Sequence, residues 1–235
     1  MFDKSRIIYE DNHLIAVNKL SGELVQSDAD GGKGLDDEIK SFIKYRDSKP
    51  GAVFLGVIHR IDRPVSGVVV FAKTSKALTR MNETVKNREV KKRYYAITER
   101  APKQEEGILT HYIKRNGKTN RSVAYDKPSE GAKEAKLIFE MVAASQHYYL
   151  VDVELITGRH HQIRAQLSKI GAPIKGDLKY GAARSNPDGS ISLHSRSMSF
   201  IHPVTKENIT IVAPLPSEDA LWVFFKESIN EKRKK

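Results

Sequence analysis

The stretch from Lys91 to Ile156 constrains the fold more than any other part of the chain, because it holds five strand-like segments and no helical one. In each segment apolar residues alternate with polar ones or are β-branched, which is typical of strands that bury one face. Short polar connections between the segments predict a meandering antiparallel sheet. The five segments are Lys91–Thr98, Ile108–Lys114, Ser122–Tyr125, Glu134–Ala143 and Tyr148–Ile156.

The rest of the chain mixes strands with amphipathic helices. With no internal repeat and no long linker, residues 1–235 are predicted to form one α+β domain with a mixed, largely antiparallel sheet and flanking helices. Helices are predicted over Leu35–Arg46, from Thr74 or Ser75 onward, between Gly158 and Gly171, and over Leu221–Ile229. Strands are predicted over Ile7–Tyr9, Leu14–Val17, Val53–Ile58, Val68–Ala72, Leu193–Phe200 and Asn208–Val212.

The chain is strongly basic. Lys and Arg number 40 against 29 Asp and Glu, which gives a formal net charge of +11. Such a balance favours a polyanionic partner, and nucleic acid is the first candidate. A basic surface that only aids solubility is the alternative at this point. The basic tail, residues 230–235, is expected to be a solvated terminus rather than a dedicated RNA anchor.

The composition also limits the chemistry and the location of the protein. The chain has no cysteine, which excludes disulfides and thiolate zinc sites. The first eight residues lack the apolar core of a signal peptide, and no window approaches about 18 continuous apolar residues. We therefore expect a cytoplasmic protein that does not insert into a membrane, and we expect a monomer.

The loop from His59 to Gly67 concentrates polar residues between two apolar runs. Pro64 restricts the backbone near Asp62, and Gly67 allows a conformation that other residues resist, so the Asp62 carboxylate can be held rigidly. That arrangement suits a nucleophile. The loop alone leaves a second interpretation open, in which Asp62 only caps a turn or pairs with a neighbouring arginine.

A second polar cluster, from Thr157 to Arg164, lies where a strand is predicted to end and a helix to begin. Arg159 and the two following histidines could contact phosphates there, because backbone amides at a helix start attract anions. Arg164, one turn further, could reach a carboxylate such as Asp62 and keep it ionised. The alternative is an ordinary helix start with solvent-facing side chains.

Four runs, in order, resemble the RluA family of pseudouridine synthases. HRIDRPVSGVVVFAKT from His59 resembles its signature around the catalytic aspartate, and KKRYYAIT from Lys91 resembles its Lys-x-Tyr segment. TGRHHQIRAQLSKIGAPIKGDLKYG from Thr157 resembles its Gly-Arg-x-His-Gln-Leu-Arg block, and LHSRSMSFIHP from Leu193 resembles its last motif. The resemblance covers most of the chain from Ile7 to about Pro214 and implies the pseudouridine synthase catalytic fold.

The resemblance also assigns roles to single residues. It makes Asp62 the catalytic aspartate, Tyr94 the active-site tyrosine and Arg164 the basic partner of the aspartate. RNA or base contacts are implied for Arg60, which would occupy the space of a flipped base, and for His59, Arg159, His161, Gln162 and Leu193. The resemblance implies no cofactor and no metal. Two positions depart from the family pattern: Ile61 replaces the usual Leu, and Val65 stands where Thr is usual.

The implied reaction breaks the N1–C1′ bond of a uridine in RNA, rotates the base and rejoins it through C5. Asp62 could attack C1′ or remove a proton from C2′ to give a glycal, and both routes remain open. Tyr94 could stack on the detached base and help to remove the C5 proton. The RNA is expected to be rRNA or tRNA. Because no separate RNA-binding domain fits before Ile7, selectivity is expected from loops such as Ser27–Gly34 and Arg184–Ser190.

Three other functions compete with this interpretation. A non-catalytic RNA-binding protein of the ribosome or of tRNA explains the charge but gives Asp62, Tyr94 and Arg164 no joint role. A hydrolase with Ser66 as its nucleophile lacks the Gly-x-Ser-x-Gly elbow. Metal hydrolysis through His59, His160 and His161 is disfavoured, because adjacent histidines point to different faces of a helix.

Overall fold

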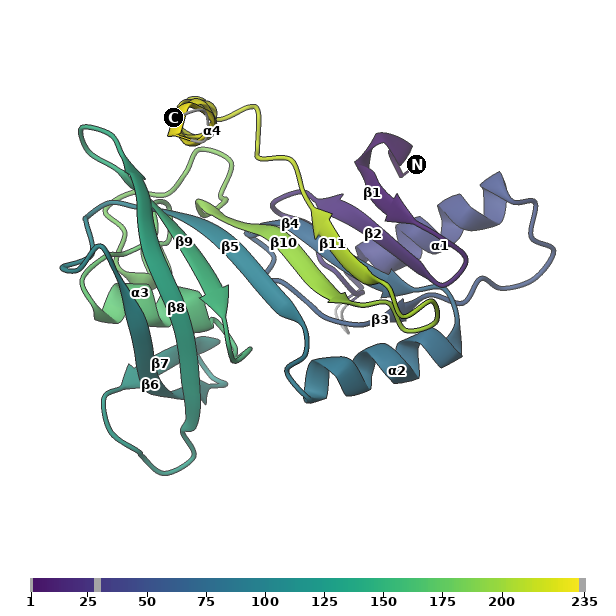
Figure 1. Ribbon diagram of the computed structural model, residues 1–235, viewed down its shortest axis with the longest axis horizontal. Coiled ribbons are helices and arrows are strands. Elements are labelled where there is room, and N and C mark those ends of the chain that lie inside the picture. Colours follow the sequence, from purple (N-terminus) through teal and green to yellow (C-terminus); the bar gives the residue numbers. More distant parts are fainter. Residues whose placement is uncertain (1, 28–30, 233–235) are drawn as a thin grey trace. The chain divides into compact units, whose positions relative to one another are not determined.

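The computed structural model describes residues 2–27 and 31–232. The chain forms two compact units: the first comprises Met1–Lys91 and Ser195–Pro214, and the second Lys92–His194 and Leu215–Lys235 (Figure 1). That both units act as one catalytic domain over residues 1–235 stays a prediction. The predicted α+β class with largely antiparallel pairing is confirmed. No helix in the described ranges is long and apolar enough to cross a membrane.

The first unit is a small sheet with helices, in which β1–β2, β2–β4, β3–β4 and β10–β11 pair antiparallel. Its strands follow one another in space as β1, β2, β4 and β10, and β11 also pairs with β10. Helix α2 packs on this sheet through Ala77 and Met81, which are fully buried among residues of β2, β4, β10 and β11. The elements are η1 (Lys4–Arg6), β1 (Ile7–Glu10), β2 (Leu14–Lys19), α1 (Leu35–Arg46), β3 (Gly56–Val57), β4 (Ser66–Ala72), α2 (Ser75–Lys86), β10 (Leu193–Ile201) and β11 (Asn208–Val212).

The start of α2 follows directly from its sequence. Thr74 has an extended backbone, and its side chain accepts a hydrogen bond from the backbone N–H of Ala77 at 3.2 Å. This N-cap confirms the predicted helix start and satisfies one of the free amides of the first turn.

The predicted strand Val53–Ile58 is wrong in its length, since only Gly56 and Val57 pair with β4. β2 occupies one edge of β4 over its whole length from Gly67 to Ala72. β10 also pairs with β4, so little of the other edge is left for β3. Phe54 is 46% exposed, so this run does not have the continuous burial that its composition predicts.

The second unit contains the five predicted strands, but not in meander order. They lie side by side as β5, β9, β8, β6 and β7, all antiparallel, so β5 pairs with β9 instead of β6. β5 and β9 are buried on both faces along most of their length, whereas β6 and β7 alternate between buried and exposed residues. Strands that are buried on both faces stabilise each other as neighbours, whereas strands with one face exposed to solvent lie at the edge of the sheet. The strands are β5 (Lys91–Thr98), β6 (Glu106–Asn116), β7 (Arg121–Tyr125), β8 (Lys133–Ala144) and β9 (Tyr149–Leu155).

Two helices complete this unit. α3 (Gln162–Lys169) lies against β6 and β7, where Ala165 packs with Ile113 and Ala124; the 3-10 turn η2 (Leu178–Tyr180) follows it. α4 (Ala220–Lys232) buries Trp222 and Phe225 against β5 and β9. α4 thus includes part of the basic tail, and residues 233–235 lie outside the described residues.

Candidate active site

The Asp62 loop is fixed by backbone hydrogen bonds within the first unit. The N–H of Val65 donates to the Asp62 carbonyl at 3.0 Å, which closes a turn, and the N–H of Gly22 donates to the Arg63 carbonyl at 2.8 Å. Arg63 returns this contact, because its Nε donates to the Gly22 carbonyl at 2.9 Å. The loop is therefore attached to the turn that follows β2, which supports the predicted rigid presentation of Asp62.

A buried lysine reinforces the same attachment. Lys19, at the end of β2, has a relative exposure of 0%, and its ammonium donates to the carbonyls of Leu20 at 2.8 Å, Glu23 at 2.8 Å and Arg63 at 3.1 Å. Burial lowers the pKa of Lys19 to about 8, although the charges of Glu23 and Asp62 act in the opposite direction. Sequence reasoning missed Lys19, because a lysine at the end of an apolar strand is usually solvated.

The Val65 departure from the family pattern fits its surroundings. Val65 is 2% exposed, so its methyl groups are buried where a hydroxyl would require a hydrogen-bond partner.

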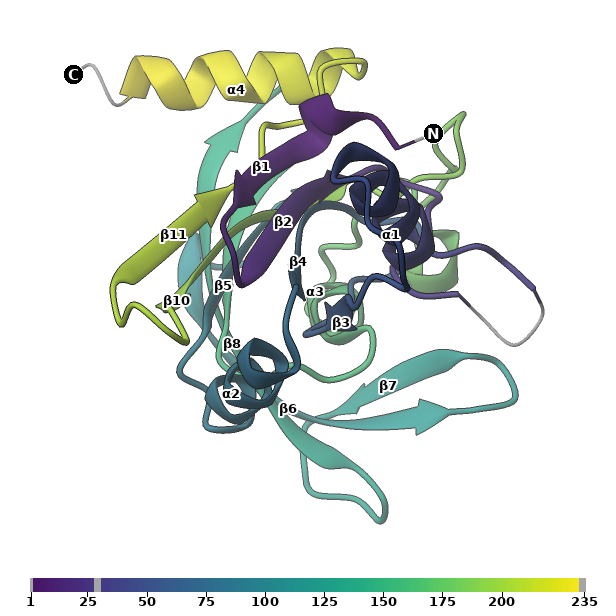
Figure 2. The same cartoon turned by 90° about the vertical axis from the view of Figure 1, so that its right-hand side faces the viewer.

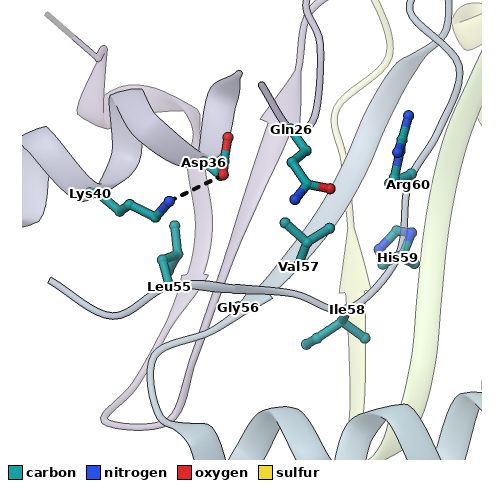
Figure 3. A pocket seen from close by; sticks show the side chains of 9 residues that line it. All are labelled: Gln26, Asp36, Lys40, Leu55, Gly56, Val57, Ile58, His59 and Arg60. Carbon is teal, nitrogen blue, oxygen red and sulfur yellow. Dashed lines mark hydrogen bonds and ion pairs between the residues drawn. The ribbon is translucent and has the colours of Figure 1, made fainter. Parts of the chain in front are cut away.

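His59 connects the loop to β4. The N–H of Val70 donates to His59 Nε2 at 3.1 Å, so the neutral ring carries its proton on Nδ1. His59 and the exposed Arg60 line an open pocket of about 490 Å³. Figure 3 shows Gln26 near them and the ion pair between Asp36 and Lys40, 3.2 Å long, further along the wall. The predicted RNA contacts of His59 and Arg60 stay predictions.

Arg164 has a carboxylate partner in the second unit that sequence reasoning missed. Its Nε and one terminal nitrogen donate to the two carboxylate oxygens of Asp177 at 2.7 and 2.8 Å. Both side chains are buried, with 6% and 1% exposure. Such a two-pronged pair fixes the plane of the guanidinium as well as its position. The predicted pairing of Arg164 with Asp62 stays a prediction.

Tyr180 completes the support of Arg164. The guanidinium carbon of Arg164 lies 5.0 Å from the Tyr180 ring centre, a cation–π distance. The Tyr180 hydroxyl accepts the N–H of Ser122 at 2.7 Å and lies 3.0 Å from His161 Nδ1. Asp177 and Tyr180 both belong to the run GDLKYG, which resembles the family motif, but their contacts with Arg164 were not predicted.

His161 and Gln162 have structural contacts at the start of α3. Burial, helped by the positive charge of Arg164, lowers the pKa of His161 to about 2, so its ring is neutral near pH 7. Gln162 Oε1 accepts from Thr157 Oγ1 at 2.8 Å and from the N–H of Arg159 at 2.9 Å. Neither side chain presents a charge to a phosphate, and their RNA contacts stay predictions.

The remaining predicted site residues occupy two kinds of position. Tyr94 and Leu193 are buried, at 7% and 4% exposure, on β5 and at the start of β10. Arg159 is half-buried, and its Nε donates to the Glu134 carbonyl at 2.8 Å. The first unit thus holds His59, Arg60 and Asp62, and the second holds Tyr94, Arg159, His161, Gln162, Arg164 and Leu193. The selectivity loop predicted over Ser27–Gly34 includes residues 28–30, outside the described ranges.

The comparisons with known proteins define the class of this protein, an isomerase that acts on RNA. A family model described as RNA pseudouridylate synthase matches residues 13–169. The chain belongs to this family, which confirms the predicted family and the predicted enzyme class, an isomerase that acts on RNA.

Individual relatives agree. The chain is 32% identical over 215 residues to an RNA pseudouridine synthase of Bacillus subtilis (strain 168), YhcT, described as uncharacterized, over 90% of this chain and 69% of that protein. It is 32% identical over 238 residues to ribosomal large subunit pseudouridine synthase C of Buchnera aphidicola subsp. Schizaphis graminum, and the match covers 96% of this chain and 70% of that protein. The solved structure of human RNA pseudouridylate synthase domain containing 4 has a TM-score of 0.78 at 24% identity, covering 96% of this chain and 93% of that one. At that identity it shows the fold alone.

Proposed function

We propose that this chain converts specific uridines of rRNA or tRNA to pseudouridine, with large-subunit rRNA as the first candidate substrate. Membership of the RNA pseudouridylate synthase family carries the proposal, and the printed names of relatives such as ribosomal large subunit pseudouridine synthase C favour the rRNA. The net charge of +11 supports it, because phosphate contacts supply sequence-independent affinity for RNA.

Asp62 is the proposed catalytic residue, acting on the ribose by either of the two routes. Its loop is held by Lys19 and Gly22 through the Arg63 carbonyl, which suits a group that must keep its geometry during the reaction. Tyr94 is proposed to stack on the detached uracil, and Arg164 to favour the ionised form of Asp62. Arg60 is proposed to enter the space of the flipped uridine, which offsets part of its unstacking cost of a few kcal/mol.

The proposal is tested by comparing the parent with Asp62→Asn on total RNA from a strain that lacks the enzyme. Pseudouridine mapping is expected to show new sites in rRNA or tRNA with the parent and none with the variant. Conversion by Asp62→Asn at the parental rate would rule out Asp62 as the catalytic residue. Absence of new sites with a folded parent protein would instead favour a non-catalytic RNA-binding protein.

We further propose that the protein acts in the cytoplasm as a monomer. The ribosomal relatives support a location where rRNA and tRNA are found. Cell fractionation tests the proposed location, and light scattering of the purified chain tests the proposed monomer. A dimer at micromolar concentration would contradict the proposed monomer.

A further inference from the structure

The β6–β7 hairpin carries a concentration of positive charge that the proposed catalytic residues do not explain. Its tip, residues 114–121, reads KRNGKTNR and contains four basic residues and no acidic one. We call Lys114, Arg115, Lys118 and Arg121 the hairpin cations. All four are exposed.

Some cations elsewhere in the protein are neutralised by carboxylates, whereas in the described ranges the hairpin cations are not. Arg6, Lys40, Arg46 and Lys73 each form ion pairs with carboxylates at 2.5–3.2 Å. Among the residues that the structure describes, no carboxylate pairs with any of the four hairpin cations. Asp126, which follows β7, pairs with Lys169 at 2.9 Å instead. The charge of the tip is therefore available to an external anion.

The tip has a defined conformation rather than a loose one. Asn116 Oδ1 accepts the N–H groups of Lys118 at 3.0 Å and Thr119 at 3.3 Å, and Arg115 donates to Asn120 Oδ1 at 2.9 Å. Lys179 of η2 donates to the Asn120 carbonyl at 3.2 Å, which brings a fifth cation to the tip. Figure 2 shows β6 and β7 as a two-stranded ribbon that ends in this turn.

The ribbon is anchored at its tip end, beside the start of α3. Ser122 donates its N–H to the Tyr180 hydroxyl at 2.7 Å, and its side chain lies 2.9 Å from His160 Nδ1. The guanidinium carbon of Arg121 lies 5.3 Å from the Tyr180 ring centre. From the paired residues Tyr112 and Tyr125 to the turn, the ribbon extends the cations by roughly 13 Å.

We propose that the β6–β7 hairpin is an RNA-binding element that holds the sugar-phosphate backbone of the substrate through the hairpin cations. This inference rests on the proposed function and extends it to a defined surface. The residues between Ile113 and Ser122 include no aromatic side chain, so the tip offers charge and hydrogen-bond donors rather than stacking platforms. Contacts of this kind hold RNA of any sequence and depend strongly on salt.

The test uses the full chain and three variants. Lys114→Gln/Arg115→Gln/Lys118→Gln removes three charges from the tip and leaves Arg121 on Tyr180. Lys114→Arg/Arg115→Lys/Lys118→Arg keeps the charge. A third variant, Lys44→Gln/Lys76→Gln/Lys86→Gln, removes the same number of charges from exposed positions on α1 and α2. Trp222 fluorescence, from a tryptophan buried in the same unit as the hairpin, verifies that the two hairpin variants are folded. Circular dichroism verifies the third variant, whose substitutions lie in the other unit.

Binding is measured by the anisotropy of a fluorescently labelled RNA stem-loop over a series of NaCl concentrations. The tip variant is expected to bind roughly 10- to 100-fold more weakly near physiological salt, with a salt slope lower by about 2 to 3. The charge-keeping variant is expected to bind like the parent, and the helix variant to lose much less. Parental affinity in the tip variant, or an equal loss in the helix variant, would overturn the proposal.

A second measurement separates this inference from the proposed function. Single-turnover isomerisation of total RNA at saturating enzyme is expected to proceed at the parental rate with the tip variant, and to slow only at low enzyme concentration. A parent that binds RNA but forms no pseudouridine would refute the proposed function and leave the hairpin inference standing. A tip variant that loses the saturated rate while keeping its RNA affinity would refute the hairpin inference.

Discussion

Replacing Asp177 by Asn tests the support of Arg164 most directly. The substitution keeps the shape of the side chain but removes the negative charge from a pair whose members are 6% and 1% exposed. Arg164 cannot lose its proton, so it would remain a buried cation without a full counter-charge. Removal of one partner of a buried ion pair typically costs about 3–5 kcal/mol of stability.

Coulomb's law gives a similar magnitude. Two unit charges about 4 Å apart at an effective dielectric constant of about 20 attract each other by about 4 kcal/mol. The Tyr180 ring, 5.0 Å from the guanidinium carbon, contacts Arg164 in the parent and in the variant, so it does not change the difference between them. We expect Asp177→Asn to lower the free energy of unfolding by about 3 kcal/mol.

The assay is urea unfolding at pH 7 followed by Trp222 fluorescence. Trp222 is the single tryptophan, and it lies in the core of the unit that contains Asp177, so its signal reports on that unit. The control is Asp126→Asn, which breaks the 2.9 Å pair with Lys169 in the same unit, at a site where Asp126 is 68% exposed. Exposed pairs contribute less than about 1 kcal/mol.

The double variant Arg164→Met/Asp177→Leu sharpens the interpretation. It removes both charges and replaces them with apolar side chains, so we expect it to recover most of the stability that Asp177→Asn loses. A loss in Asp177→Asn no larger than that in Asp126→Asn would refute the claim that a buried charge was left uncompensated. A double variant less stable than Asp177→Asn would contradict it as well.

The other predictions concern Arg164, Tyr180 and Lys19. Arg164→Met is expected to slow isomerisation without abolishing RNA binding; a variant that turns over at the parental rate would contradict the pairing with Asp62. Tyr180→Phe removes a buried hydroxyl that accepts an N–H at 2.7 Å, and we expect a loss of about 1–3 kcal/mol in the same urea assay. The pKa of Lys19 falls from 10.5 to about 8 on folding, so the unfolded chain binds more protons between these values and stability rises with pH there, by up to about 3 kcal/mol. Lys19→Met is expected to lose this rise, as measured by circular dichroism during urea unfolding at both ends of the range, and a variant with the parental pH dependence would exclude Lys19 as its source.

Local patterns predicted the elements well but not the order of the strands. Thr74 caps α2 because its side-chain hydroxyl accepts a hydrogen bond from a backbone N–H of the first turn. This helix start could be predicted from the neighbouring residues alone. That β5 pairs with β9, and not with β6 as in a meander, depends on which faces are buried in the assembled sheet. The composition of β9, Tyr149–Leu155, is equally compatible with an edge and with a central strand. The shortness of β3 has the same origin, since it reflects competition for an edge of β4.

The candidate residues Asp62 and Arg164 were easier to select from the sequence than the residues that contact them. Asp62 and Arg164 lie in runs of polar residues beside segments that are predicted to be buried. Charged side chains at such positions usually have a specific role, so their residue types alone make them candidates. Lys19 and Asp177 are different, because a lysine after a strand and an aspartate between glycine and leucine are common on surfaces. Their burial, 0% and 1%, depends on carbonyls and a guanidinium contributed by distant residues.

The position of Asp177 nevertheless carries information that a sequence can supply. Arg164 falls on the buried face of α3, beside Ala165 and Leu167, and a helical arginine that faces a core requires a counter-charge. After α3 ends, Asp177 is the next carboxylate in the chain, 13 residues beyond Arg164. Gly171 has a φ of +84° and Gly176 a φ of +86°, and both allow the chain to turn in this interval. A search for the nearest carboxylate after a buried helical arginine would therefore have named Asp177, although the contribution of Tyr180 depends on the fold of β7 and could not be found in this way.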